Sequence, residues 1–192
     1  MAFLATSAHS LVVPICLTAS LAFGQAPLRC GSDMMRQRMI VQHPEILRTE
    51  NDLERFTHDY IEEHAGQREE DTVRVIPMVF HILHNYGPEN ISDAQIHDAV
   101  AILNRDYRKL NADTIQIVHG FDTIAADVHL QFKLATIDNL GNCTNGIQRI
   151  RTMKTYLGDD GAKLFPWNHH NYLNVWVCAN MEDGVAGYAY YP

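Results

Sequence analysis

The nearly continuous apolar stretch at residues 73–83 (VRVIPMVFHIL) constrains the fold more than any other part of the sequence. A strand of this character has both faces covered, as in sheets with other layers packed on each side. Pro77 lacks the backbone N–H that a sheet ladder uses, so we expect the first half of the strand to lie at an edge or a bulge. The sequence therefore predicts a buried strand with a weakly paired beginning.

A helix is predicted directly after this strand. Ser92 and Gln95 have the spacing of a capping box, and an apolar residue recurs every three or four positions at Ile96, Val100, Leu103, Tyr107 and Leu110. Residues 128–134 then alternate between apolar and polar, which predicts a half-buried strand. Further strands are expected at 146–151, 172–178 and 187–191. This order of elements indicates an α/β (α+β) domain.

The N-terminal part has a different character. Residues 1–24 contain no charged side chain, include the apolar run 11–17, and end in Ala22-Phe23-Gly24, which suits cleavage before Gln25. The apolar run is shorter than the roughly 20 residues that span a bilayer. We therefore expect a signal peptide at 1–24 and a secreted protein with no membrane partner.

Residues 25–70 are expected to form a helical extension. Residues 32–42 are amphipathic, Pro44 can open a second helix, and apolar residues follow at close to helical spacing. Residues 66–71 (GQREED) contain no apolar side chain, so they are interpreted as an exposed linker. The domain limits predicted are 1–24, 25–70 and 71–192.

Charge excludes one class of partner. The 15 Lys and Arg residues stand against 23 Asp and Glu residues, giving a net charge of −8, and no basic run interrupts this balance. A nucleic-acid binder or a protein of anionic membrane surfaces normally carries a basic patch. Nucleic acid is therefore not expected as a partner.

The cysteine count leaves one thiol over. Cleavage of the signal peptide removes Cys16 and leaves Cys30, Cys143 and Cys178, an odd number for an oxidising compartment. A bridge between Cys143 and Cys178 is one arrangement and leaves Cys30 alone. Glycosylation of the sequons at Asn90 and Asn142 stays open.

No complete catalytic set is visible in the residues. The signatures H-E-x-x-H, G-x-S-x-G, the Walker loop and G-x-G-x-x-G are all absent from the sequence. His81 and His84 are three apart in a strand and should face opposite ways, so His81 is interpreted as a buried structural imidazole. The pair His169-His170 is expected to diverge. The acidic residues Glu62, Glu63, Asp159 and Asp160 are interpreted as solvated.

One small motif, Arg29-Cys30-Gly31, carries a side chain suited to metal binding. A thiolate is a good zinc ligand and can fill the fourth position that a catalytic zinc leaves for water. The segments that follow it form a recognisable series. They are 29–32 (RCGS), 76–83 (IPMVFHIL), 91–96 (ISDAQI), 103–111 (LNRDYRKLN), 125–127 (AAD), 132–135 (FKLA), 146–149 (GIQR), 172–178 (YLNVWVC) and 187–192 (GYAYYP).

In this order, over residues 28–192, the chain resembles the pappalysin-type (ulilysin-like, cytophagalysin) zinc endopeptidases of the metzincin clan. The resemblance implies a secreted zymogen that hydrolyses proteins or peptides, with zinc as cofactor and calcium left open. It implies that Cys30 is the latency ligand. It also implies that the backbone of Tyr188, Ala189 and Tyr190 lies in an edge strand that binds substrate by strand addition.

The sequence departs from the family in one large respect. The family's zinc helix, H-E-x-x-H-x-x-G-x-x-H, and its Met-turn are absent. We therefore expect a partial sequence, truncated before the zinc helix and inactive alone. A secreted non-catalytic α/β binding module is the alternative. A thiol enzyme built on Cys30 is a weaker one, because no base can be assigned to it.

Overall fold

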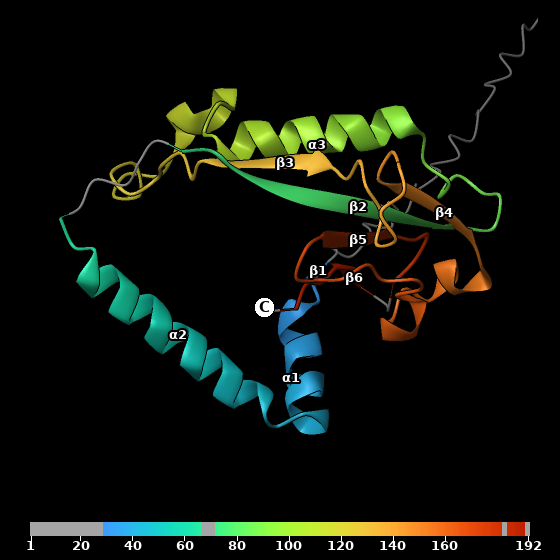
Figure 1. The fold of residues 1–192 in the computed structure, drawn as a ribbon, viewed down its shortest axis with the longest axis horizontal. Coiled ribbons are helices and arrows are strands. Elements are labelled where there is room, and N and C mark those ends of the chain that lie inside the picture. Colours follow the sequence, from blue (N-terminus) through green and yellow to red (C-terminus); the bar gives the residue numbers. More distant parts are fainter. Residues whose placement is uncertain (1–28, 67–71, 182–183, 191–192) are drawn as a thin grey trace, which may run out of the picture.

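The structure is a computed structural model that describes residues 29–66, 72–181 and 184–190 (Figure 1). The predicted signal peptide and most of the predicted linker lie outside these residues. Among the residues described, no helix is long and apolar enough to cross a membrane.

A four-stranded parallel sheet is built around the long strand β2 (Arg74–His84). Strand β3 (Leu130–Leu134) pairs with residues 74–78 of β2, and β4 (Ile147–Arg151) pairs with residues 80–84. Strand β5 (Leu173–Val177) pairs with residues 78–82. Because β5 overlaps both β3 and β4 along β2, it occupies the opposite edge, and β3 and β4 follow one another along a single edge.

This arrangement confirms the prediction about Pro77. Residues 74–77 of β2 have β3 as their neighbour, whereas β5 begins its pairing only at Met78. The first half of the strand is therefore an edge on the β5 side within the described residues. A missing N–H costs least at such an open side.

Helix α3 (Asp93–Tyr107) covers one face of the sheet (Figure 1). The capping box of Ser92 and Gln95 is present as predicted. Beneath the helix lies a core made of Met78, Phe80, Ile82, Ile96 and Phe132, with further half-buried apolar residues around it. The helix ends at Tyr107, before the predicted Leu110, because Lys109 takes a left-handed φ of 52°.

Asn104 of α3 closes the outer edge of β3. Its Oδ1 accepts from the backbone N of Phe132 at 2.7 Å, and its Nδ2 donates to the carbonyl of Phe132 at 2.9 Å. The side-chain amide thus replaces one residue of a neighbouring strand. Covering exposed strand edges in this way prevents pairing with other chains.

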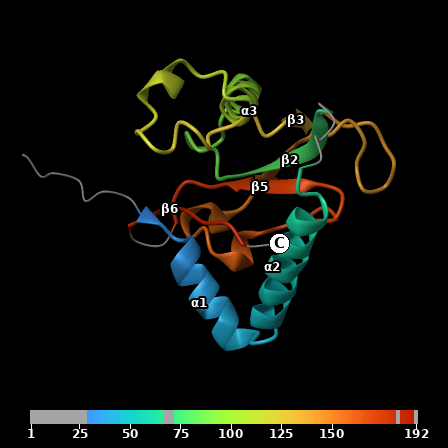
Figure 2. The same cartoon turned by 90° about the vertical axis from the view of Figure 1, so that its left-hand side faces the viewer.

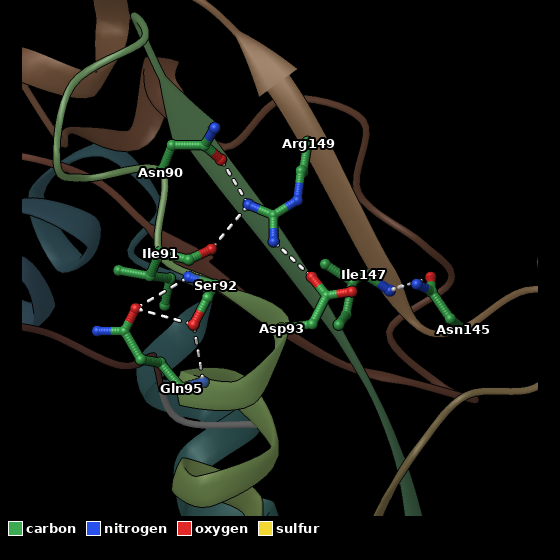
Figure 3. Close-up of polar contacts among 8 residues, drawn as sticks. All are labelled: Asn90, Ile91, Ser92, Asp93, Gln95, Asn145, Ile147 and Arg149. Atoms are coloured by element: carbon green, nitrogen blue, oxygen red, sulfur yellow. Dashed lines mark hydrogen bonds and ion pairs between the residues drawn. The ribbon is translucent and has the colours of Figure 1, made fainter.

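A second cross-connection joins β4 to the start of α3 (Figure 3). The guanidinium of Arg149 donates to the carbonyl of Ile91 at 2.7 Å and to side-chain oxygens of Asn90 and Asp93, both at 2.5 Å. One side chain therefore fixes the loop, the helix start and the strand together.

The opposite face of the sheet carries a smaller core of Val79, Ala135, Trp167 and Tyr172. His81 lies on this face with 0% exposure, stacks on Trp176 with ring centroids 4.8 Å apart, and places Nε2 3.0 Å from Oδ1 of Asn174. Burial is the main cause that lowers the pKa of His81. The prediction of a buried structural imidazole is confirmed.

Helices α1 (Ser32–Gln42) and α2 (Ile46–Glu63) lie on the side of the sheet opposite α3 (Figure 2). The predicted helices are confirmed, although α2 begins two residues after Pro44. Arg36 of α1 bonds Glu50 of α2, with Nε 2.9 Å from Oε1. Helix α2 has no buried residue among those described, so its apolar stripe is uncovered there.

A separate two-stranded sheet joins the two ends of the described chain. Strand β1 (Arg29–Cys30) pairs parallel with β6 (Val185–Gly187). The predicted strand at 187–191 is therefore wrong in two respects. It begins two residues earlier, at Val185, and it ends at Gly187, so Tyr188, Ala189 and Tyr190 lie outside any strand. Its partner is the N-terminal extension. A local residue pattern carries no information about a partner so distant in the sequence.

Candidate functional site

The candidate site lies where the N-terminal extension meets the last described segment. The amide of Gly31 donates to the carbonyl of Gly187 at 2.7 Å, and the amide of Ala189 donates to Oγ of Ser32 at 3.0 Å. Residues 30–32 thus lie along residues 187–189. The approach is tight at position 31, since a Cβ there would lie 2.7 Å from Cγ1 of Val185 and would force a shift.

Cys30 is exposed at this junction. Its Sγ lies 3.4 Å from Oγ of Ser32. Hydrogen bonds from the side chain and backbone of Ser32 lower the pKa of the thiol, and they outweigh the opposing effects of desolvation and Asp33. The thiolate, which is the form that binds metals and attacks electrophiles, is therefore favoured.

Met35 anchors the first turn of α1 on the same surface. The residue is only 5% exposed, and its amide makes the first hydrogen bond of α1, to the carbonyl of Gly31 at 2.9 Å. Met34 and Met35 line a small hollow together with Gly158, Asp159, Met181, Val185 and Tyr188. The extension is thus held by backbone bonds and by one buried apolar side chain.

Two tyrosines fix the other flank of the last segment. The hydroxyl of Tyr188 donates to Oδ1 of Asp160 at 3.2 Å, and that of Tyr190 bonds Oδ2 of the same carboxylate. Lys163 pairs with Asp160 at 2.8 Å and places Nζ 3.6 Å from the centre of the Tyr190 ring. Burial, together with the carboxylate, raises the pKa of both tyrosines, so they stay neutral donors.

The predicted site residues are brought together in part. Cys30 and the segment Tyr188, Ala189 and Tyr190 meet through Ser32, although they are predicted from distant parts of the sequence. The amide of Ala189, predicted as a substrate contact, is occupied by the Ser32 hydroxyl in this structure.

The predicted bridge between Cys143 and Cys178 is wrong for this structure, where both thiols are free. Cys143 lies in the loop between β3 and β4, in a bridge with Ile137, while Cys178 follows β5 on the opposite edge of β2.

Two other expectations need correction. The imidazoles of His169 and His170 do not diverge, because their ring centroids are 4.1 Å apart. Asp160 does not belong to a merely solvated face, since it bonds two tyrosines and a lysine. Tyr188 and Tyr190 are two apart in an extended segment, so their side chains share one side. This spacing is the sequence signal for a common polar partner, which the structure identifies as Asp160. Glu62 and Glu63 are exposed as predicted.

The described residues do not themselves fit a zinc ion. No group of three or more His, Cys, Asp or Glu side chains that could hold a metal occurs in the part of the chain that the structure describes. Cys30 offers one thiolate, and a protein zinc site needs three or four ligands.

Comparison with known proteins identifies relatives of this fold. No family model and no curated protein matches the chain. Among solved structures, Tannerella forsythia mature mirolysin in complex with a cleaved peptide is 37% identical, with a TM-score of 0.52, over 56% of this chain and 43% of that chain. Mirolysin in complex with a compound is 38% identical, with a TM-score of 0.54, over 58% and 44%.

A mutant of Tannerella forsythia promirolysin matches more of this chain. It is 33% identical, with a TM-score of 0.65, over 83% of this chain and 53% of that chain. The chain thus spans about half the length of the structures it matches. These neighbours are pappalysin/ulilysin-type metzincins, and in sequence and fold the chain resembles their N-terminal part.

Proposed function

We propose that the chain is the pro-segment and N-terminal subdomain of a secreted zinc metalloendopeptidase that hydrolyses peptide bonds in proteins. The pro-segment is residues 25–70 and the subdomain is residues 71–192, after a signal peptide at 1–24. The observation that carries the proposal is the docking of Cys30, Gly31 and Ser32 along residues 187–189.

Latency is the role that this docking supports. Cys30 is exposed beside the paired segment, and Ser32 favours its thiolate. In the proposed zymogen this thiolate is the latency ligand of the zinc ion, whose remaining ligands lie outside this sequence. When bound, a catalytic zinc polarises the scissile carbonyl and activates water.

The same docking bears on substrate binding. The carbonyl of Gly187 and the amide of Ala189 are backbone groups that a peptide could use by strand addition. Both are bonded by the extension in this structure. Removal of the pro-segment would release them for a peptide at Tyr188, Ala189 and Tyr190.

One substitution tests the proposal in the intact protein that carries a zinc helix. Cys30→Ala should give a protein that hydrolyses casein or processes itself without added protease. Cys143→Ala is the matched control, since it also removes an exposed thiol but lies in the loop between β3 and β4. If the Cys30 variant folds and stays as latent as the control, Cys30 is not the latency ligand. A genuine stop after codon 192 would instead favour a secreted binding module.

A further inference from the structure

Residues 188–190 follow directly on β6, whose strand partner belongs to the proposed pro-segment. Within the described ranges, β6 pairs with β1 and with no other strand. Once the pro-segment is removed, an unrestrained backbone here must lose conformational entropy before it can pair with a peptide. A contact from the subdomain that holds this backbone in place would lower that cost.

Tyr188 and Tyr190 provide such a contact. Both hydroxyls bond the carboxylate of Asp160, and the two ring centroids lie 5.6 Å apart, so both side chains stand on one side of the segment. Ala189 lies between them, and its amide donates to Ser32. The backbone N–H and C=O groups of an extended segment lie across the direction of its side chains. Holding the two rings therefore fixes the direction in which the Ala189 amide points.

Asp160 is itself held by the body of the subdomain. It begins the short 3₁₀ helix η3 (Asp160–Ala162), in which Ala162 is buried. The chain after η3 is tied to β5, because the indole N–H of Trp176 donates to the carbonyl of Leu164 at 3.0 Å. These contacts do not involve the pro-segment, so they remain when it is removed.

Lys163 completes the arrangement. Its Nζ lies 2.8 Å from Oδ1 of Asp160, 4.7 Å from the centre of the Tyr188 ring and 3.6 Å from that of Tyr190. The ammonium group balances the charge of the carboxylate and attracts the faces of both rings. The two tyrosines are thus held at their hydroxyls by an anion and at their ring faces by a cation.

We propose that Asp160 is a positioning residue for peptide binding. Through Tyr188 and Tyr190 it orients residues 187–189, so that the carbonyl of Gly187 and the amide of Ala189 are aligned for an added strand. The inference rests on the proposed function, in which these two groups bind substrate backbone once the pro-segment is removed. Asp160 acts through the tyrosines and does not itself contact the peptide. A site that is ordered in advance loses less entropy when its ligand binds.

The test uses the whole chain with Gly31→Ala, which loosens the pro-segment, and measures hydrogen exchange of the Ala189 amide. The probe is an alanine peptide of about seven residues with a lysine at each end, added at about 1 mM. Asp160→Ala is the test variant. Asp159→Ala is the matched control, because it removes the neighbouring carboxylate, whereas the tyrosine hydroxyls bond Asp160.

With Asp160 in place, the peptide should slow exchange of the Ala189 amide about tenfold, as a Kd of about 0.1 mM requires. Asp160→Ala should reduce this slowing to less than about twofold, while Asp159→Ala leaves it at about tenfold. Asp160→Glu keeps a carboxylate for the hydroxyls and should restore most of the slowing. Continued protection of the Phe132 amide verifies the fold of each variant.

A double-mutant cycle separates positioning from a general structural role of Asp160. Tyr188→Phe/Tyr190→Phe keeps both rings but removes the hydroxyls, so it should reduce the slowing as far as Asp160→Ala does. Adding Asp160→Ala to these two substitutions should then have no further effect, because the groups through which Asp160 acts are already gone. A further loss in that background would overturn the inference.

Two other outcomes overturn it and separate it from the proposed function. If the peptide slows exchange equally in the Asp160→Ala and Asp159→Ala variants, residues 187–189 bind peptide backbone but Asp160 does not position them. If the peptide slows exchange of Ala189 in no folded variant, including the one that retains Asp160, the peptide-binding surface is absent and both proposals fail.

Discussion

The amide of Ala189 donates to the hydroxyl of Ser32 at 3.0 Å across 157 positions of the chain. The same hydroxyl accepts from the thiol of Cys30 at 3.4 Å. A hydroxyl has two acceptor lone pairs and one donor, so Ser32 can serve both groups when Cys30 is a thiol or a thiolate. One small side chain therefore couples the candidate latency thiol to the segment that the pro-segment covers.

Gly31→Ala should loosen the pro-segment. The added Cβ would lie 2.7 Å from Cγ1 of Val185, so the Val185 side chain or the paired backbone of β1 and β6 must shift. We expect tryptic cleavage after Arg36 and Arg38 to become about tenfold faster, corresponding to roughly 1.4 kcal/mol of lost docking energy. Gly187→Ala is the matched control, because a Cβ there meets no atom within 4 Å. Equal cleavage rates for the two variants would contradict the close approach of Gly31.

Asn104→Ala should destabilise the sheet domain. It removes two hydrogen bonds to Phe132 and leaves an unpaired N–H and C=O at a half-buried edge. We expect the free energy of unfolding to fall by about 2–4 kcal/mol, measured by urea denaturation. His97→Ala, on the exposed side of α3, should change it by less than about 0.5 kcal/mol. A loss no larger than that of the control would show that Asn104 does not close the edge.

The parts of the fold that the sequence predicts are those with local signals. The Ser92 and Gln95 pair starts α3, the apolar run produces β2, and Pro77 falls where β2 has an open side. These features depend on residues a few positions apart, so spacing and residue type suffice to find them.

The parts that sequence reasoning missed depend on distant partners. The pairing of β1 with β6 joins the two ends of the described chain, and the burial of Met35 follows from that pairing. Nothing in the pattern of residues 32–42 distinguishes Met35 from the exposed Met34. Cys143 and Cys178 illustrate the reverse error, because a turn and a strand end suggest a bridge that the structure does not form.

The thiols should differ in reactivity. Hydrogen bonds from Ser32 lower the pKa of Cys30, while burial raises the pKa of Cys178. Near pH 7.5 without reductant, we expect iodoacetamide to modify Cys30 well before Cys178, with Ser32→Ala slowing Cys30 selectively. Mass spectrometry of the modified peptides measures both rates. If Cys143 and Cys178 react only after reduction, the disulfide exists and the free thiols of the structure are wrong.

Asp160 should contribute stability that is lost in acid. Burial alone would raise the pKa of its carboxyl, but bonds from Lys163 and Tyr190 lead the effects that lower it overall. A carboxyl with a lower pKa in the folded state stabilises the protein above its unfolded pKa, about 3.9, and loses this contribution as the pH falls through the folded pKa. The unfolding free energy of the parent should therefore fall more steeply below about pH 4 than that of Asp160→Asn.

Urea denaturation at a series of pH values makes this comparison. Glu89, Asp127 and Asp138 also have lowered pKa values, but they titrate in both chains and cancel in the difference. Parallel curves for the parent and Asp160→Asn would show that Asp160 does not gain its bonds in solution.

Amide hydrogen exchange of the whole chain tests the docking of the pro-segment most directly. The amides of Gly31 and Ala189 both donate across the junction, at 2.7 Å and 3.0 Å. The account predicts that both exchange at least about a hundredfold more slowly than unprotected amides, and that Gly31→Ala removes the protection of both together. Unprotected exchange at Gly31 and Ala189 in the parent, with Phe132 still protected in the sheet, would contradict it.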